Sequence, residues 1–144
     1  MADRLIYFIS ANHERSSIAE GWASRLYIPG TKFKSAGWAG AKKNPFTLQA
    51  MQEISIDIAS ITPYRISESD LSKAEVIVLI QDPEKDEEIS IHPSFSEKVV
   101  NWNIVNPAKR ANDPFAKWAM FQEICDDIAL KIRELEKELS ASAV

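Results

Sequence analysis

Apolar runs and apolar stripes define most of the elements in this chain. Residues 5–9 and 76–80 are continuously apolar, without the alternation of a half-exposed strand. Such runs are typical of parallel strands that are covered on both faces of a sheet. Two shorter segments, residues 32–35 (Lys-Phe-Lys-Ser) and 99–102 (Val-Val-Asn-Trp), are also expected to be strands.

The last third of the chain predicts one long amphipathic helix over residues 115–139. Its apolar residues recur at steps of three and four and form one stripe, which consists of Trp118, Phe121, Cys125, Ile128, Ile132, Leu135 and Leu139. Asp113 and Pro114 precede the stripe as a helix cap and the first helical residue. Because Cys125 lies on the stripe, we expect it to be an inert core thiol.

Three shorter helical segments are expected between the strands. They are a helix over residues 18–26 capped by Ser16 or Ser17, a helix that begins with Asn44 as cap and Pro45 as first residue, and a helical turn at residues 71–74. Residues 35–40 are predicted to form a loop, in which Gly37 and Gly40 make backbone turns.

Strands that alternate with helices predict an α/β fold with a parallel sheet. We therefore expect a three-layer α/β/α domain with four parallel strands joined by right-handed crossovers. The 144 residues suit one domain over residues 1–139, followed by a frayed tail over residues 140–144. The leucines of the last helix beyond Arg133 could extend past this domain and pack on a second copy, which would make a homodimer.

Composition and charge narrow the classes of function. A hydrophobic fraction of 45% and a charged fraction of 26% are typical of a globular protein, and no apolar run is long enough to span a bilayer. The net charge of -4 argues against general nucleic-acid binding. The single cysteine excludes an internal disulfide, and we expect no metal site and no cofactor. A reducing, cytoplasmic location fits this cysteine usage.

The loop between the first strand and the first helix has the features of an anion site. Backbone N–H groups at a helix start collect at the carboxyl edge of the sheet, where they can hold a phosphate or sulfate ion. Arg15 adds a guanidinium for the oxyanion, whereas a Glu14 carboxylate ~4 Å away would weaken binding by about 1 to 4 kcal/mol. The residues expected to bind the anion are Ser10, Asn12, His13, Arg15 and Ser16.

Several segments resemble the low-molecular-weight protein tyrosine phosphatase family, and most closely its thioredoxin-coupled arsenate reductase branch. The matching segments are Ile6–Ser10, Arg15–Ser16, Ala19–Trp22, Ser35–Gly37 and the helix at Asn44, and the resemblance extends from residue 5 to about residue 139. The resemblance implies a sheet with the strand order 2-1-3-4. It also implies a loop of the form Cys-x5-Arg-Ser, in which the cysteine is the nucleophile.

At the family's catalytic positions this chain has other residues. Aligning on the strand puts Ser10 at the nucleophile position, with four residues before Arg15, whereas aligning on the arginine puts Ile9 there. Gln81 takes the place of the first resolving cysteine of the arsenate reductases. Asn106 stands where the family has the aspartate that acts as general acid before a proline, and an amide cannot donate and recover a proton as a carboxyl can.

These replacements favour a non-catalytic role, in which a degenerate phosphatase or arsenate reductase binds a protein or senses a small anion. The acidic residues after the second long apolar run are either a solvated loop or a docking surface for a basic partner. The residues expected to contact the unidentified partner are Glu14, Trp38, Asp82, Glu84, Asp86, Glu87 and Glu88.

Two alternatives stay open. The first is a variant phosphatase or arsenate reductase that uses Ser10 as a replacement nucleophile, with His13 or Glu14 as the base that a serine hydroxyl needs. The second is an assembly protein that uses its C-terminal helix.

Overall fold

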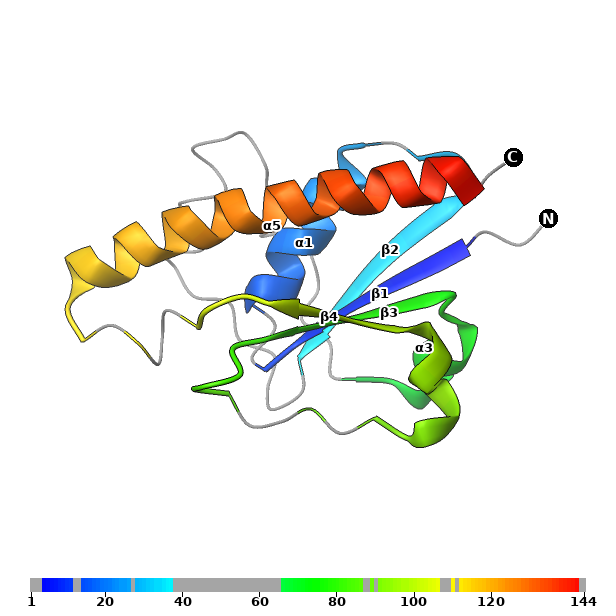
Figure 1. The fold of residues 1–144 in the computed structure, drawn as a ribbon, viewed down its shortest axis with the longest axis horizontal. Coiled ribbons are helices and arrows are strands. Elements are labelled where there is room, and N and C mark those ends of the chain that lie inside the picture. The colour runs from blue at the N-terminus through cyan, green and yellow to red at the C-terminus, as the bar shows by residue number, and fades with distance from the viewer. Residues whose placement is uncertain are drawn as a thin grey trace.

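The computed structural model describes residues 4–11, 14–26, 28–37, 66–86, 89, 91–106, 110 and 112–142. Within these residues, four parallel strands form one sheet in the order β2-β1-β3-β4 (Figure 1). The strands are β1 (Arg4–Ser10), β2 (Thr31–Gly37), β3 (Val76–Gln81) and β4 (Val99–Asn103). The four predicted strands, the parallel sheet and the strand order are confirmed.

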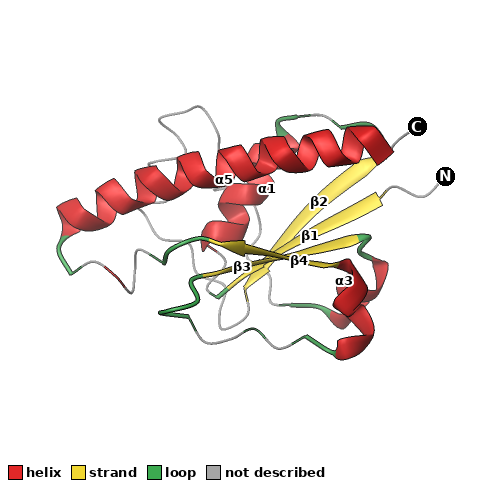
Figure 2. Ribbon diagram, in the orientation of Figure 1, coloured by secondary structure: helices red, strands yellow, loops and turns green. Residues whose placement is uncertain are grey.

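Helices cover both faces of this sheet, which makes the three layers that the sequence predicts. The helical elements are α1 (Glu14–Ser24), α3 (Glu68–Lys73), the 3-10 helix η1 (Pro93–Lys98) and α5 (Pro114–Ser142). Helices α1 and α5 lie on one face, whereas α3 lies on the other (Figure 2). No described helix is both long enough and apolar enough to pass through a bilayer.

The continuous apolar run of β1 divides its side chains between two cores. Ile6 and Phe8 pack with residues of α1 and α5. Tyr7 and Ile9 point to the other face and pack with residues of α3. All four side chains are buried, so the run lacks alternation because both faces of the strand are covered.

The long C-terminal helix packs along its predicted stripe. The carboxylate Oδ1 of Asp113 accepts a hydrogen bond of 2.9 Å from the Ala116 backbone N–H, which confirms the predicted cap. Cys125, Leu135 and Leu139 are buried in the core that α5 shares with α1 and β1. The two leucines that could have packed on a second copy are therefore buried within the chain itself. The helix continues to Ser142.

Two local predictions differ from the structure. Helix α1 begins at Glu14, so Ser16 and Ser17 lie inside its first turn and neither is its cap. Strand β2 continues to Gly37, which pairs with Ser10 in the sheet and makes no turn. The turn that leads into β2 uses Gly30, whose φ of 66° lies in the left-handed region. The helix predicted at Asn44, and Gly40, lie outside the described residues.

Candidate functional site

The candidate site lies where the carboxyl ends of the parallel strands meet the start of α1. Ser10 is the last residue of β1 and pairs with Gly37 of β2 and Ile80 of β3. The chain reaches α1 a few residues later, at Glu14. In an open parallel sheet, ligands bind at this edge, outside the carboxyl ends of the strands.

The hydroxyl groups of Ser10 and Ser16 form a buried chain of hydrogen bonds. The Ser10 hydroxyl donates to Ser16 Oγ at 2.9 Å, and the Ser16 hydroxyl donates to the Ala36 carbonyl at 3.0 Å. In return, Ser10 Oγ accepts from the Ser16 backbone N–H at 3.0 Å. Ser10 thus satisfies an N–H in the first turn of α1, which explains how the helix begins without a cap at Ser16.

Arg15 crosses from α1 to the far side of the same edge. Its side chain is only 1% exposed, and its Nη1 donates to the Ile104 carbonyl at 3.0 Å, just beyond β4. Its Nη2 lies 2.7 Å from Asp86 Oδ2, in an ion pair whose two side chains are equally buried. Arg15, which the sequence analysis expects to bind a free anion, is therefore paired with the Asp86 carboxylate of the same chain.

The Asp86 carboxylate receives further hydrogen bonds besides this ion pair. The Asp82 backbone N–H donates to Oδ2 at 2.8 Å, and Asn106 Nδ2 donates to Oδ1 at 2.7 Å. Burial by itself raises the pKa of Asp86, but these hydrogen bonds and the charge of Arg15 outweigh it and hold the pKa below its ordinary value. Asp86 is therefore a carboxylate at neutral pH.

Asp82 anchors the turn that carries Asp86. Its carboxylate accepts two hydrogen bonds from Arg110, from Nε at 2.5 Å and from Nη2 at 2.7 Å, and another from the Asn106 backbone N–H at 2.9 Å. The hydrogen bonds from Arg110 hold the pKa of Asp82 well below its ordinary value, and the same contacts raise the pKa of Arg110.

The structure brings some of the predicted site residues together. Ser10, Arg15 and Ser16 are all buried, and the Ser10 and Ser16 hydroxyls bond to each other, whereas the Arg15 guanidinium reaches Ile104 and Asp86; a shared role in binding an anion stays a prediction. Glu14 begins α1, but its side chain is not described. Asn12, His13, Trp38, Glu87 and Glu88 lie outside the described residues.

The prediction for the acidic turn needs correction. Asp82 and Asp86 are buried, because Arg110 and Arg15 pair with them, so these two carboxylates form neither a solvated loop nor a docking surface. Glu84 is the described acidic residue that fits the predicted surface, with a side chain that is 76% exposed.

Sequence reasoning missed the groups that hold the two buried aspartates. Arg110 is 28 residues from Asp82, and Asn106 is 20 residues from Asp86, so no local pattern connects them. The available signal was topological, since residues that follow β3 and β4 must meet at the same edge of a parallel sheet. Within the described residues, no cluster of histidine, cysteine, aspartate or glutamate is arranged to hold a metal ion.

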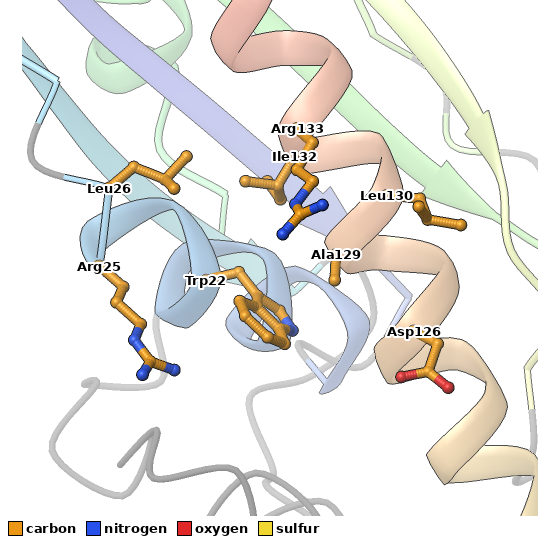
Figure 3. Close-up of a pocket in the computed structure, with 8 residues that line it drawn as sticks. All are labelled: Trp22, Arg25, Leu26, Asp126, Ala129, Leu130, Ile132 and Arg133. Carbon is orange, nitrogen blue, oxygen red and sulfur yellow. The ribbon is translucent and has the colours of Figure 1, made fainter.

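A separate cavity of about 540 Å³ opens between α1 and α5 (Figure 3). Side chains of both helices and of the turn after α1 line it: Trp22, Arg25, Leu26, Asp126, Ala129, Leu130, Ile132 and Arg133. The described lining includes none of the residues at the carboxyl edge of the sheet, so this cavity is distinct from the candidate site.

Known proteins match the chain over almost its whole length. Residues 4–144 match the sequence model of the low molecular weight phosphotyrosine protein phosphatase family. An arsenate reductase from Oceanobacillus iheyensis is 31% identical over 95% of this chain and 98% of its own length. An arsenate reductase from Halalkalibacterium halodurans is 34% identical over 92% of this chain and 95% of its own length.

Solved structures agree on the fold. The YwlE arginine phosphatase from Geobacillus stearothermophilus superposes with a TM-score of 0.79 at 16% identity, covering 96% of this chain and 94% of its own. A YwlE mutant with a phosphorylated active-site serine superposes with a TM-score of 0.72 at 16% identity, covering 94% of this chain and 95% of its own.

These matches overturn the prediction of a non-catalytic, regulatory domain. The curated relatives that share about a third of their residues with this chain, over nearly full length, are named arsenate reductases. The family model that matches describes a phosphatase. The prediction inferred loss of activity from single positions, whereas the similarity over the whole chain favours the alternative of a variant enzyme.

Proposed function

Because the chain belongs to the low molecular weight phosphotyrosine protein phosphatase family, we propose that it is an enzyme that hydrolyses phosphate esters at the Ser10–Ser16 loop. Arg15 holds the oxyanion and Ser10 is the nucleophile. The observation that carries the proposal is that Ser10, at the carboxyl end of the central strand, hydrogen-bonds to Ser16 in the first turn of α1, whose neighbour Arg15 has a buried side chain. A cytoplasmic location is part of the same proposal.

The proposed reaction proceeds through a phosphoserine. Ser10 Oγ gives its proton to a base and attacks phosphorus, the bond to the ester oxygen breaks, and that oxygen takes up a proton and leaves as the alcohol. Water later cleaves the phosphoserine, which restores the serine hydroxyl and releases phosphate. The Arg15 guanidinium offers charge and N–H donors to the oxygens that gain negative charge. One neighbour of the same fold, the YwlE mutant, carries a phosphorylated active-site serine, which supports serine as an acceptor in this fold.

A serine hydroxyl needs a base, because it is far less acidic than a cysteine thiol. Among the described residues, both hydrogen bonds of the Ser10 hydroxyl group go to Ser16. His13 and Glu14 therefore remain the candidate bases in this proposal, since their side chains lie outside the described part.

Arsenate reduction is the second candidate, and the names of the curated relatives favour it. Reduction of arsenate to arsenite needs two electrons, which two thiols supply when they are oxidised to one disulfide. This chain has one cysteine, Cys125, and burial raises the pKa of its thiol to about 12. In this candidate function an external thiol must therefore supply the electrons.

An activity assay tests both functions. Purified protein is given p-nitrophenyl phosphate or, separately, arsenate with dithiothreitol, and the products are measured. We expect ester hydrolysis that is lost in Ser10→Ala and Arg15→Lys but kept in Ser24→Ala, a matched change at the exposed end of α1. Mass spectrometry of acid-quenched protein should find phosphate on Ser10. Hydrolysis that survives both site variants would contradict the proposal.

A further inference from the structure

The donors around Asp86 are arranged as they are in an oxyanion site. A guanidinium (Arg15 Nη2, 2.7 Å), a backbone N–H (Asp82, 2.8 Å) and a side-chain amide (Asn106 Nδ2, 2.7 Å) converge on one carboxylate. Proteins hold phosphate and carboxylate groups with this mixture of donors. The occupant here is a side chain of the same chain.

The pair between Arg15 and Asp86 is shielded from water. Both side chains are 1% exposed. Arg15 Nη2 is buried, and among the described residues its contact is the ion pair with Asp86 Oδ2, 2.7 Å away. A tetrahedral oxyanion has more oxygens than a carboxylate and can meet donors in directions that a planar group leaves empty.

A substrate oxyanion and Asp86 cannot both keep Arg15. Two anions at one buried guanidinium repel each other, and the repulsion is strong where water is excluded. The Arg15 guanidinium also has few free donors, because its Nη1 already donates to the Ile104 carbonyl. It therefore cannot bind both anions at once. One of the two anions must leave.

We propose that Asp86 is a built-in competitor of the substrate, which occupies Arg15 in the resting protein and is displaced by a tetrahedral oxyanion. The inference rests on the proposed function, because it assigns the same arginine to the substrate. It adds that, while Arg15 pairs with Asp86, the oxyanion position is filled by a side chain of the protein itself.

The turn that carries Asp86 can release it without unfolding the edge of the sheet. Asp82 stays anchored by Arg110 and by the Asn106 backbone N–H. The Asp86 backbone N–H donates to the Asp82 carbonyl at 2.9 Å, which closes the turn behind the anchor. Displacement requires the Asp86 side chain to leave Arg15, the Asn106 amide and the Asp82 backbone N–H, while the anchor at Asp82 stays in place.

Binding of inorganic phosphate and of arsenate, measured by calorimetry, tests the inference. Asp86→Asn keeps the size of the side chain and removes its charge, so we expect it to bind both ions roughly tenfold or more tightly than the wild-type protein. Adding Arg15→Lys to Asp86→Asn should abolish this gain. The matched control is Glu84→Gln, which removes an exposed charge from the same turn and should change the affinity by less than about twofold.

The outcomes separate this inference from the proposed function. Equal affinities in the wild-type protein and Asp86→Asn, both dependent on Arg15, overturn the competitor and leave the enzyme proposal standing. Absence of binding in Asp86→Asn also overturns the competitor, whereas the enzyme proposal is judged by turnover of the wild-type protein.

A second measurement serves if Asp86→Asn does not fold. Phosphate is titrated into the wild-type protein while NMR follows the Arg15 guanidinium nitrogens and the Asp86 carboxyl carbon. Displacement shifts both sets of resonances along one saturable curve. An Asp86 resonance that does not move at saturating phosphate, while Arg15 responds, contradicts the inference.

Discussion

The two sides of the carboxyl edge of the sheet are stabilised by different chemistry. On the β1 and β2 side the hydrogen bonds are between neutral groups: the Ser10 hydroxyl donates to Ser16, and the Ser16 hydroxyl donates to the Ala36 carbonyl. On the β3 and β4 side, Asp82 and Asp86 are buried anions held by guanidinium and amide groups. The backbone of Arg15 lies in α1 on the first side, and its guanidinium pairs with Asp86 on the second side.

This difference predicts unequal costs of disruption. A neutral hydrogen bond contributes about 1 kcal/mol net to stability, because it replaces hydrogen bonds that the same groups make to water in the unfolded chain. Removing one partner of a buried ion pair costs about 3–5 kcal/mol, because the other charge is left without compensation. The ionic side should therefore dominate the stability of the edge, while the neutral side tolerates change.

The largest effect is expected from Arg15→Met. This change leaves the Asp86 carboxylate buried among fewer donors, so the free energy of unfolding should fall by about 3–5 kcal/mol. Urea unfolding followed by tryptophan fluorescence measures it. The double variant Arg15→Met/Asp86→Leu removes both charges and should recover most of the loss. Additive losses in the two single variants and the double variant would show that the pair contributes no coupling.

Asp82→Asn should have the next largest effect, about 2 kcal/mol near neutral pH, because the groups that donate to Asp82 then face a neutral amide instead of a carboxylate. Since folding lowers the pKa of Asp82 from 3.8, its contribution is present above that value and is lost as the pH falls toward the folded pKa. The free energy of unfolding of the wild-type protein should therefore decline from about pH 5 downward, and more steeply than that of the variant.

Urea midpoints at several pH values between about 2 and 7 check this prediction. Asp86 remains in the variant and has a lowered pKa as well, so part of the decline should persist. Identical slopes for the two proteins would mean that Asp82 does not keep its charge preferentially in the folded state.

The neutral side should lose less. Ser16→Ala removes the donor to the Ala36 carbonyl and the acceptor for the Ser10 hydroxyl, which should lower the free energy of unfolding by about 1 kcal/mol. Ser24→Ala, at the exposed end of the same helix, is the control for removing a serine hydroxyl from α1. A loss from Ser16→Ala as large as that from Arg15→Met would remove the contrast between the two sides.

Much of the fold could be predicted from the sequence because it depends on periodicity. The uninterrupted apolar run of β1 and the stripe of α5 each record which faces are covered, and both are confirmed. The start of α1 could not be read in this way. One backbone N–H of its first turn, that of Ser16, donates to the side chain of Ser10 in the preceding strand. A search for local caps does not detect that contact.

The candidate site was only partly predictable for a related reason. Arg15 and Ser10 lie in one loop, so the chain itself places them together. The partner of Arg15 comes from the turn after β3, which the composition of residues 81–88 presents as a solvated acidic stretch. Charge sign alone does not distinguish a solvated carboxylate from one that folding places beside a guanidinium.

The smallest effect is expected where the ionic side reaches the surface. Glu84 Oε2 lies 3.2 Å from Arg110 Nη2, but the Glu84 side chain is 76% exposed. Water and salt screen such a pair, and holding it fixed costs side-chain entropy. Glu84→Gln should therefore leave the urea midpoint unchanged within the error of the measurement, at both low and high salt. A clear, salt-sensitive loss would mean that Arg110 depends on Glu84 to hold Asp82, and the buried network would then extend to the surface.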